Sequence, residues 1–165
     1  MKAFDPLGAL ERLSAHGVAF VLIGGLAARL QGSPSVTDDL DICHSVEPEN
    51  LQRLARALKE MEARLRGAPD DVPFRLDAKT LAAGANFTFS TTFGPLDCLA
   101  LPSGVNGYRE LSRTADPMRF DDLEILVASV DDLILMKRAA GSPKDLVELE
   151  ILGALKEEIE KGNDD

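Results

Sequence analysis

The sequence contains no tryptophan, and aromatic residues make up only 5% of its 165 positions. Hydrophobic residues nevertheless reach 45%, so any core must consist mainly of Leu, Ala, Val and Ile. A chain of this length can bury most of the surface that its unfolded form exposes, without covalent staples. We therefore expect residues 1–165 to form a single domain.

Cysteine is also scarce. Cys43 and Cys98 each lie among apolar residues, which is typical of small buried side chains in a reducing compartment and not of a disulfide framework. The sequence shows no basic start followed by an apolar run, and no apolar stretch near the roughly 18 residues of a membrane helix. We expect a cytoplasmic protein without a membrane partner.

Positive charge is in short supply, because 18 Lys and Arg residues stand against 28 Asp and Glu, a formal net charge of −10. Binding to long nucleic acid needs clustered Lys and Arg. We therefore do not expect long nucleic acid as a partner, although a local basic pocket is compatible with this composition.

Helical periodicity and short apolar runs alternate along the chain, which predicts an α/β (α+β) fold. We expect helices at 5–15, 26–31, 47–66, within 104–114, at 129–137 and from 143 onward, and strands at 18–23, 40–43, 86–92, 96–101 and 123–128. The short connection at Gly94-Pro95 favours an antiparallel hairpin. The expected architecture is a small mixed sheet with flanking helices and a C-terminal helical pair.

Gly24 and Gly25 stand between an expected strand and an expected short helix. Two glycines at such a junction let a ligand come close to the backbone. The first N–H groups of the helix have no partner within it, so they can bind phosphate oxygens. Glycine is also common in strand–helix turns without a ligand, and its spacing alone favours that structural interpretation.

Asp39 and Asp41 are separated by one residue, so in a strand their side chains point to the same face. Carboxylates this close repel each other, and a hard cation removes the conflict. Mg²⁺ takes one or two carboxylates together with substrate phosphates. The pair therefore predicts a metal site, and the alternative is solvated acids at a strand end.

Asp97 lies in the otherwise apolar segment from Gly94 to Leu101. An acid in an apolar strand is costly without a partner. As a third carboxylate it would allow two metal ions, one for the attacking group and one for the triphosphate and the leaving pyrophosphate. The alternative is a salt bridge to Lys or Arg.

Lys137 and Lys144 are two candidate cations for binding nucleotide phosphates. Either could meet triphosphate charge as a point cation. Gly141 and Pro143 interrupt the chain between them, so a shared helix face does not follow. From the residues alone, a helix-end cation and a solvated Lys are the simpler interpretation.

Taken together, Gly24-Gly25, Asp39-Leu40-Asp41-Ile42 and the later Asp97 resemble the nucleotidyltransferase superfamily of DNA polymerase beta type. The resemblance covers most of the chain and is closest to small bacterial members, including AbiEii-like toxins and minimal nucleotidyltransferases. It implies the nucleotidyltransferase fold. Candidate site residues follow from it: catalytic and metal-binding Asp39, Asp41 and Asp97; nucleotide-binding Gly24, Gly25, Thr37, Lys137 and Lys144; and Asp145 beside them.

The resemblance implies transfer of an NMP from an NTP, such as ATP, to an acceptor hydroxyl, with two Mg²⁺ (or Mn²⁺) ions as cofactor. Asp97 would help to deprotonate the acceptor. Protein, tRNA and small-molecule acceptors stay open, as does the nucleobase. Ser35 and Ser142 stand where members often carry Arg. These departures favour one alternative, a weak or inactive member that binds nucleotide or a partner protein. A toxin–antitoxin component with a cognate partner is another.

Overall fold

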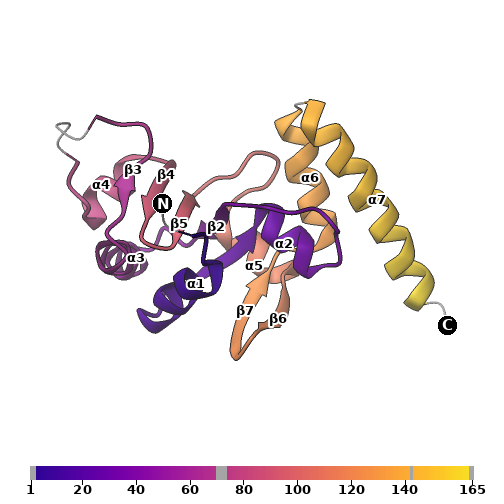
Figure 1. Ribbon diagram of the computed structural model, residues 1–165, viewed down its shortest axis with the longest axis horizontal. Helices are drawn as coiled ribbons and strands as arrows, with labels where there is room; N and C mark the ends of the chain where they lie inside the picture. The colour runs from indigo at the N-terminus through magenta and orange to yellow at the C-terminus, as the bar shows by residue number, and fades with distance from the viewer. Residues whose placement is uncertain (1–2, 70–73, 142, 164–165) are drawn as a thin grey trace.

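The computed structural model describes residues 3–69, 74–141 and 143–163. Within these ranges, seven strands form one sheet in the order β3-β4-β5-β2-β1-β7-β6, which runs from left to right in Figure 1. The strands are β1 Phe20–Ile23, β2 Leu40–His44, β3 Arg64–Leu65, β4 Asn86–Thr91, β5 Gly94–Leu99, β6 Asp116–Phe120 and β7 Leu123–Val127.

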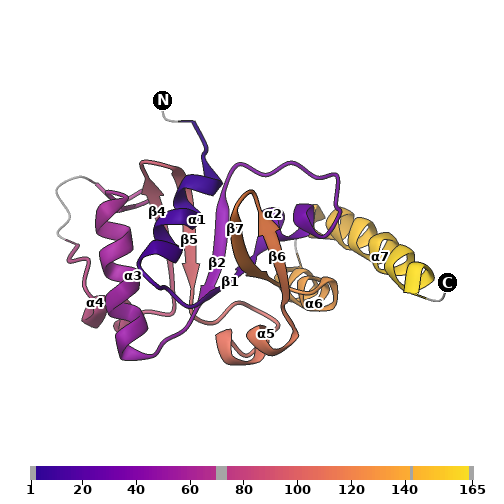
Figure 2. The same cartoon turned by 90° about the horizontal axis from the view of Figure 1, so that it is seen from below.

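The helices connect and flank these strands. They are α1 Pro6–Ala15, α2 Gly24–Leu30, α3 Pro48–Glu60, α4 Ala78–Ala83, α5 Tyr108–Thr114, α6 Val130–Ala140 and α7 Pro143–Asn163. Ser129 caps α6, because its side chain accepts a hydrogen bond from the Asp132 N–H. Helices α6 and α7 form the expected C-terminal pair, and α7 extends away from the body of the fold (Figures 1 and 2). None of the described helices combines the length and apolar character needed to cross a bilayer.

The sheet is mixed, as expected. Strand β2 runs antiparallel to β1 and parallel to β5, and β4 and β5 form the predicted antiparallel hairpin. Strand β7 joins β1 in parallel and pairs with β6 in an antiparallel ladder. Strands β5 and β2, third and fourth in this order, are therefore neighbours although residues 45–93 separate them in the chain.

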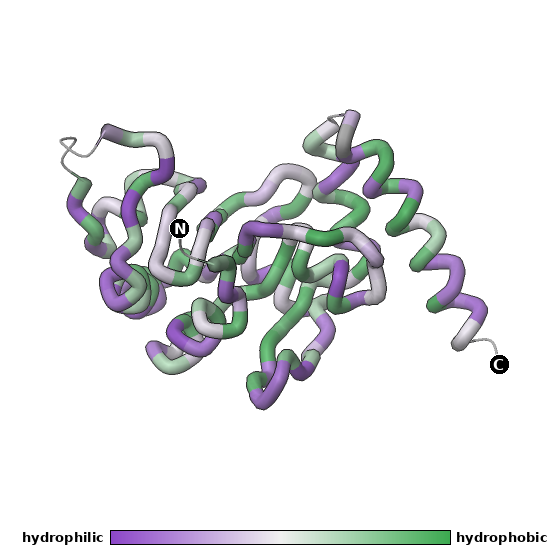
Figure 3. Tube along the Cα trace, viewed as in Figure 1, coloured by the Kyte–Doolittle hydropathy of each residue, from purple (hydrophilic) through white to green (hydrophobic). Residues whose placement is uncertain are grey.

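The core is mainly aliphatic, as the composition predicts. Leu22 and Ile42 in the central strands are fully buried, and Phe89 is a fully buried aromatic side chain. Burying each large apolar side chain contributes about 1.5–3 kcal/mol. Figure 3 shows hydrophobic residues along the central strands and hydrophilic ones toward the end of α7. Cys43 and Cys98 are buried free thiols, and burial raises the pKa of Cys43 to about 12.

The expected helix over 47–66 is wrong in its second half. Helix α3 ends at Glu60, and Glu62 adopts a left-handed conformation with φ of 53°. This reversal turns the chain into β3, which pairs with β4 at one edge of the sheet. Besides β3, two further elements were not expected from the sequence, α4 and β6. Pro117 weakens the strand signal of β6, and its position in an edge strand explains why the sheet tolerates it.

Candidate active site

Two neighbouring parallel strands bring the three predicted carboxylates together. Asp41 in β2 lies opposite Asp97 in β5 in the strand register. Asp39 precedes β2 by one residue, so the expectation that it lies within the strand is corrected. One carboxylate oxygen from each of Asp39, Asp41 and Asp97 lies within 4.8 Å of the others. Leu40 and Ile42 point the opposite way, into the core.

Asp41 is the most strongly perturbed of these acids. Burial raises its pKa to about 8, and the charge of Asp39 and the hydrogen bond with Asp97 act in the same direction. Its Oδ1 atom is buried and has no hydrogen-bond partner among the described residues. Such an oxygen needs either a proton or a cation, because an unpaired buried charge is unstable. The residues present therefore fit a divalent metal ion.

The glycine turn makes room for this acid. Gly24 begins α2 with φ of 73°, and a Cβ atom there would lie 2.1 Å from Asp41 Oδ2. A Cβ atom on Gly25 would lie 2.8 Å from the Thr37 Cβ. The two glycines are thus needed for close packing around the acidic cluster. No side chain caps the start of α2. The role of Gly24 and Gly25 in nucleotide binding stays a prediction.

Thr37 holds Asp39 in place. Its Oγ1 atom lies 3.0 Å from Asp39 Oδ1 and 3.2 Å from the Asp39 carbonyl oxygen, and the hydroxyl donates to these oxygens. Asp39 precedes the strand, so this hydroxyl supplies an orientation that the sheet register does not. The predicted contact of Thr37 with nucleotide is a separate matter and stays a prediction.

Arg66 is a neighbour of the site that sequence reasoning missed. Its Nη2 atom donates to Asp97 Oδ1 at 2.9 Å and to the carbonyl oxygen of Phe89 at 2.8 Å. The structure therefore shows the salt bridge that was the alternative interpretation of Asp97, while its role as a metal ligand in the carboxylate cluster stays a prediction. Residues 66 and 97 are far apart in sequence, and the expected helix placed Arg66 away from the sheet.

Lys137 in α6 is a second described cation whose charge reaches the site. Its charge opposes the rise in the pKa of Asp41. Its Nζ atom lies 3.2 Å from Asp145 Oδ1, with the Lys and Asp side chains 29% and 12% exposed. Helix α7 therefore braces Lys137 through Asp145. Lys144 lies in the first turn of α7, and its side chain and Ser142 are outside the described residues.

Arg29 places a cation near Ser35, the position at which members of the resembled family often carry Arg. The Ser35 carbonyl oxygen accepts a hydrogen bond from Arg29 Nη1 in α2 at 3.3 Å. A guanidinium group therefore contacts the loop before Thr37, although the residue expected to supply it is Ser.

Comparison with known proteins supports the fold. No family model and no curated protein matches the sequence. The structure is similar to the lincosamide antibiotic adenylyltransferase LnuA with lincomycin bound, at a TM-score of 0.59 and 14% identity over 90% of this chain and 94% of that one. It is also similar to the antibiotic-resistance factor ANT(2'')-Ia, at a TM-score of 0.50 and 14% identity over 95% and 92% of the two chains. This chain therefore has the nucleotidyltransferase fold.

Proposed function

We propose that this protein is a metal-dependent nucleotidyltransferase that moves an NMP from an NTP to an acceptor hydroxyl. The observation that carries the proposal is the meeting of Asp39, Asp41 and Asp97 within 4.8 Å on the sheet of this fold. Three convergent carboxylates in a partly buried position are ligands for Mg²⁺ or Mn²⁺ and a poor site for anything anionic.

Asp39, Asp41 and Asp97 would hold the metal ions, two of them in the complete complex with NTP. The buried, unpartnered Oδ1 of Asp41 supports this assignment. Bound divalent ions would supply charge neutralisation at the triphosphate and a lower pKa for the attacking hydroxyl.

The protein's own groups position and deprotonate the reactants. The acceptor oxygen forms a bond to the α-phosphorus, and the bond from that phosphorus to the bridging oxygen breaks, so pyrophosphate leaves with the electron pair. Asp97, whose side chain is 20% exposed and therefore open to solvent, would take the hydroxyl proton. Lys137, Lys144 and the N–H groups of the Gly24-Gly25 turn bind phosphate charge.

The first acceptors to test are small hydroxylated compounds, with ATP as the first nucleotide. LnuA is described as a lincosamide antibiotic adenylyltransferase and matches over 94% of its own length. The net charge of −10 adds weight against an RNA acceptor. A cognate partner protein, as in a toxin–antitoxin pair, stays a prediction from the family resemblance.

A transfer assay tests the proposal. Each NTP, labelled at the α-phosphate, is incubated with Mg²⁺ and a panel of hydroxylated acceptors, and labelled product and pyrophosphate are both measured. We expect equal amounts of the two with the wild type and a loss of about 10²–10⁴-fold with Asp97→Asn, the size of a general-base contribution. Asp38→Asn is the matched control, because Asp38 is an exposed acid outside the cluster.

The same assay separates the catalytic proposal from its alternative. No labelled product for any acceptor, together with metal-dependent NTP binding in a separate titration, would favour a binding protein with this fold. Product formation that is unchanged in Asp97→Asn would contradict the assignment of the base.

A further inference from the structure

The sheet register fixes the position of Arg66 beside the carboxylate cluster. The Arg66 backbone N–H donates to the Thr88 carbonyl oxygen at 2.9 Å, and Thr88 lies directly opposite Asp97 in the β4–β5 ladder. From this anchor the side chain extends across β4, where Nη2 donates to the Phe89 carbonyl oxygen, and reaches the Asp97 carboxylate in β5. Backbone and side chain are both held, so the contact between Arg66 and Asp97 is part of the fold and not a chance surface encounter.

Arg66 places a positive charge directly beside one carboxylate of the cluster. The three clustered carboxylates can carry three negative charges, and Arg66 donates directly to Asp97 Oδ1. Among the described side chains, Lys137 also acts on the cluster through its charge, and Asp145 engages it. With Arg66 in place, one divalent ion balances the three carboxylates. A second divalent ion would leave surplus positive charge unless a triphosphate accompanied it.

The contact is also weak enough to be released. The side chains of Arg66 and Asp97 are 36% and 20% exposed, and ion pairs with this much solvent access contribute little net free energy. A guanidinium group stays charged at any accessible pH, so Arg66 can leave Asp97 only by moving.

We propose that Arg66 occupies, in the nucleotide-free protein, the place of a second divalent cation beside Asp97. The free protein then binds one divalent ion through Asp39 and Asp41, and Asp97 accepts a second ion only after Arg66 has moved away. Arg66 is thus a positioning residue that makes the second ion depend on substrate. This inference rests on the metal site proposed above.

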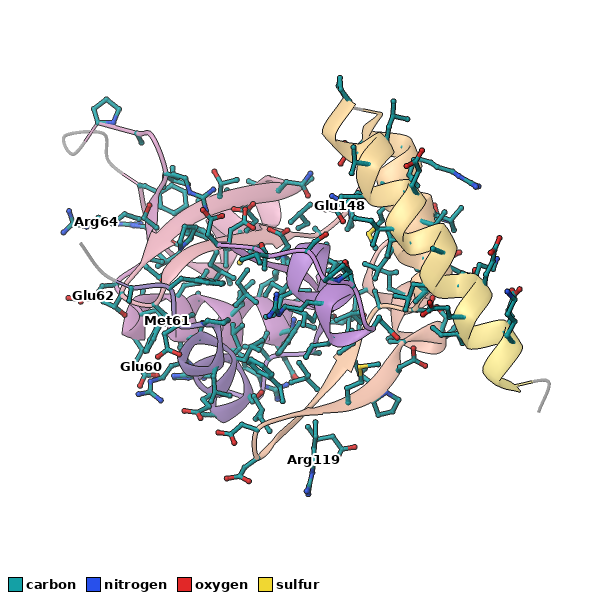
Figure 4. The ribbon with its side chains drawn as sticks, turned by 45° about the vertical axis from the view of Figure 1, so that its right-hand side comes forward. Glu60, Met61, Glu62, Arg64, Arg119 and Glu148 are labelled. Atoms are coloured by element: carbon teal, nitrogen blue, oxygen red, sulfur yellow. The ribbon has the colours of Figure 1, made fainter. Side chains whose placement is uncertain are left out.

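Counting bound Mn²⁺ without nucleotide tests the inference. Free Mn²⁺ is measured by electron paramagnetic resonance while the protein is titrated. We expect the wild-type chain to bind one ion and the Arg66→Gln chain to bind two. The second ion in Arg66→Gln should bind at least about tenfold more tightly than any second ion in the wild type, because Arg66 no longer makes its charge-assisted contact with Asp97. Arg64→Gln is the matched control. Arg64 lies in β3, two residues before Arg66. Its side chain points outward in Figure 4, and it has no ion pair among the described residues.

The same substitution in an Asp97→Asn protein separates the effect of the Arg66 charge on metal binding from an effect on folding. In Asp97→Asn the substitution Arg66→Gln should add no second ion, because its partner carboxylate is gone. Thermal unfolding in EDTA confirms that each variant is folded. Equal Mn²⁺ stoichiometry and affinity in wild type and Arg66→Gln would overturn the inference while leaving the metal site in place. A wild type that binds no Mn²⁺ would overturn both.

Discussion

Asp41 and Asp97 lie opposite each other on the parallel strands β2 and β5, so the backbone register itself holds their carboxylates together. Gly24 lies close to the other side of Asp41, since a Cβ atom there would come within 2.1 Å of its Oδ2 atom. The metal-free fold therefore carries an electrostatic conflict, and stability, pH response and metal affinity should all depend on it.

Replacing Asp41 should stabilise the metal-free protein at high pH. The folded pKa of about 8 lies above the reference value of 3.8, so the proton on Asp41 stabilises the fold at low pH. That contribution is complete below the unfolded pKa and is lost as the pH rises toward 8. We expect Asp41→Asn, which needs no proton, to gain about 4 kcal/mol over the wild type between pH 5 and pH 8.5, at about 1.4 kcal/mol for each unit of pKa difference.

Urea unfolding in EDTA at both pH values measures this difference. The wild type serves as the reference at each pH, so the titration of other acids cancels. A stability difference that is the same at pH 5 and pH 8.5 would show that Asp41 is not protonated in the folded, metal-free protein.

Metal binding should release a proton from the same carboxyl group. Below the pKa of about 8, a metal ion must displace the Asp41 proton, so the apparent Mg²⁺ affinity should rise about tenfold per pH unit and level off above pH 8. Calorimetry in two buffers of different ionisation enthalpy counts the proton. We expect about one proton released per ion at pH 6.5 and none at pH 9. Equal heats in the two buffers at pH 6.5 would argue against this coupling.

Gly24→Ala should damage the site and the fold together. The new Cβ would meet Asp41 Oδ2 at 2.1 Å, and the φ of 73° is unfavourable for any residue with a Cβ. We expect a loss of about 2 kcal/mol or more in the free energy of unfolding. Gly153→Ala is the control, because Gly153 lies within α7 with nothing within 4 Å, and it should gain about 0.5–1 kcal/mol. A Gly24→Ala protein as stable as the wild type would contradict this account of the turn.

Thr37→Val should weaken metal binding with little effect on stability. The substitution keeps the shape of the side chain and removes the hydroxyl that donates to Asp39. Loss of a group that orients a metal ligand reduces metal affinity by about 10–100-fold. Thr37→Ser keeps the hydroxyl and should restore most of that affinity in a Mn²⁺ titration. If Val and Ser variants bound Mn²⁺ equally, Thr37 would have no part in orienting Asp39.

The sequence predicted the parts of the site that follow from local periodicity. Alternation by two places Asp41 on the face opposite Leu40 and Ile42, and an acid within an apolar strand marked Asp97. The pairing of those two strands could be expected only through the family resemblance, because strand order is a tertiary property.

The missed elements depend on tertiary contacts. Residues 60–65 have good helix formers, yet the left-handed Glu62 ends the helix and pairing with β4 makes the next residues a strand. Arg66 reaches Asp97 only because of this reversal. The sequence singled out the glycine pair for nucleotide binding, which stays a prediction, and did not indicate its close packing against Asp41 and Thr37.

Isothermal titration of ATP and the other NTPs tests the central claim most directly. The wild type is titrated with Mg²⁺ and with EDTA, beside an Asp39→Asn, Asp41→Asn double variant and the Asp38→Asn control. We predict that one NTP binds per chain in Mg²⁺, that EDTA or the double substitution abolishes binding, and that Asp38→Asn retains it. Binding that is equal with and without metal, or no binding of any NTP to the wild type, would contradict the claim that these carboxylates form a nucleotidyltransferase site.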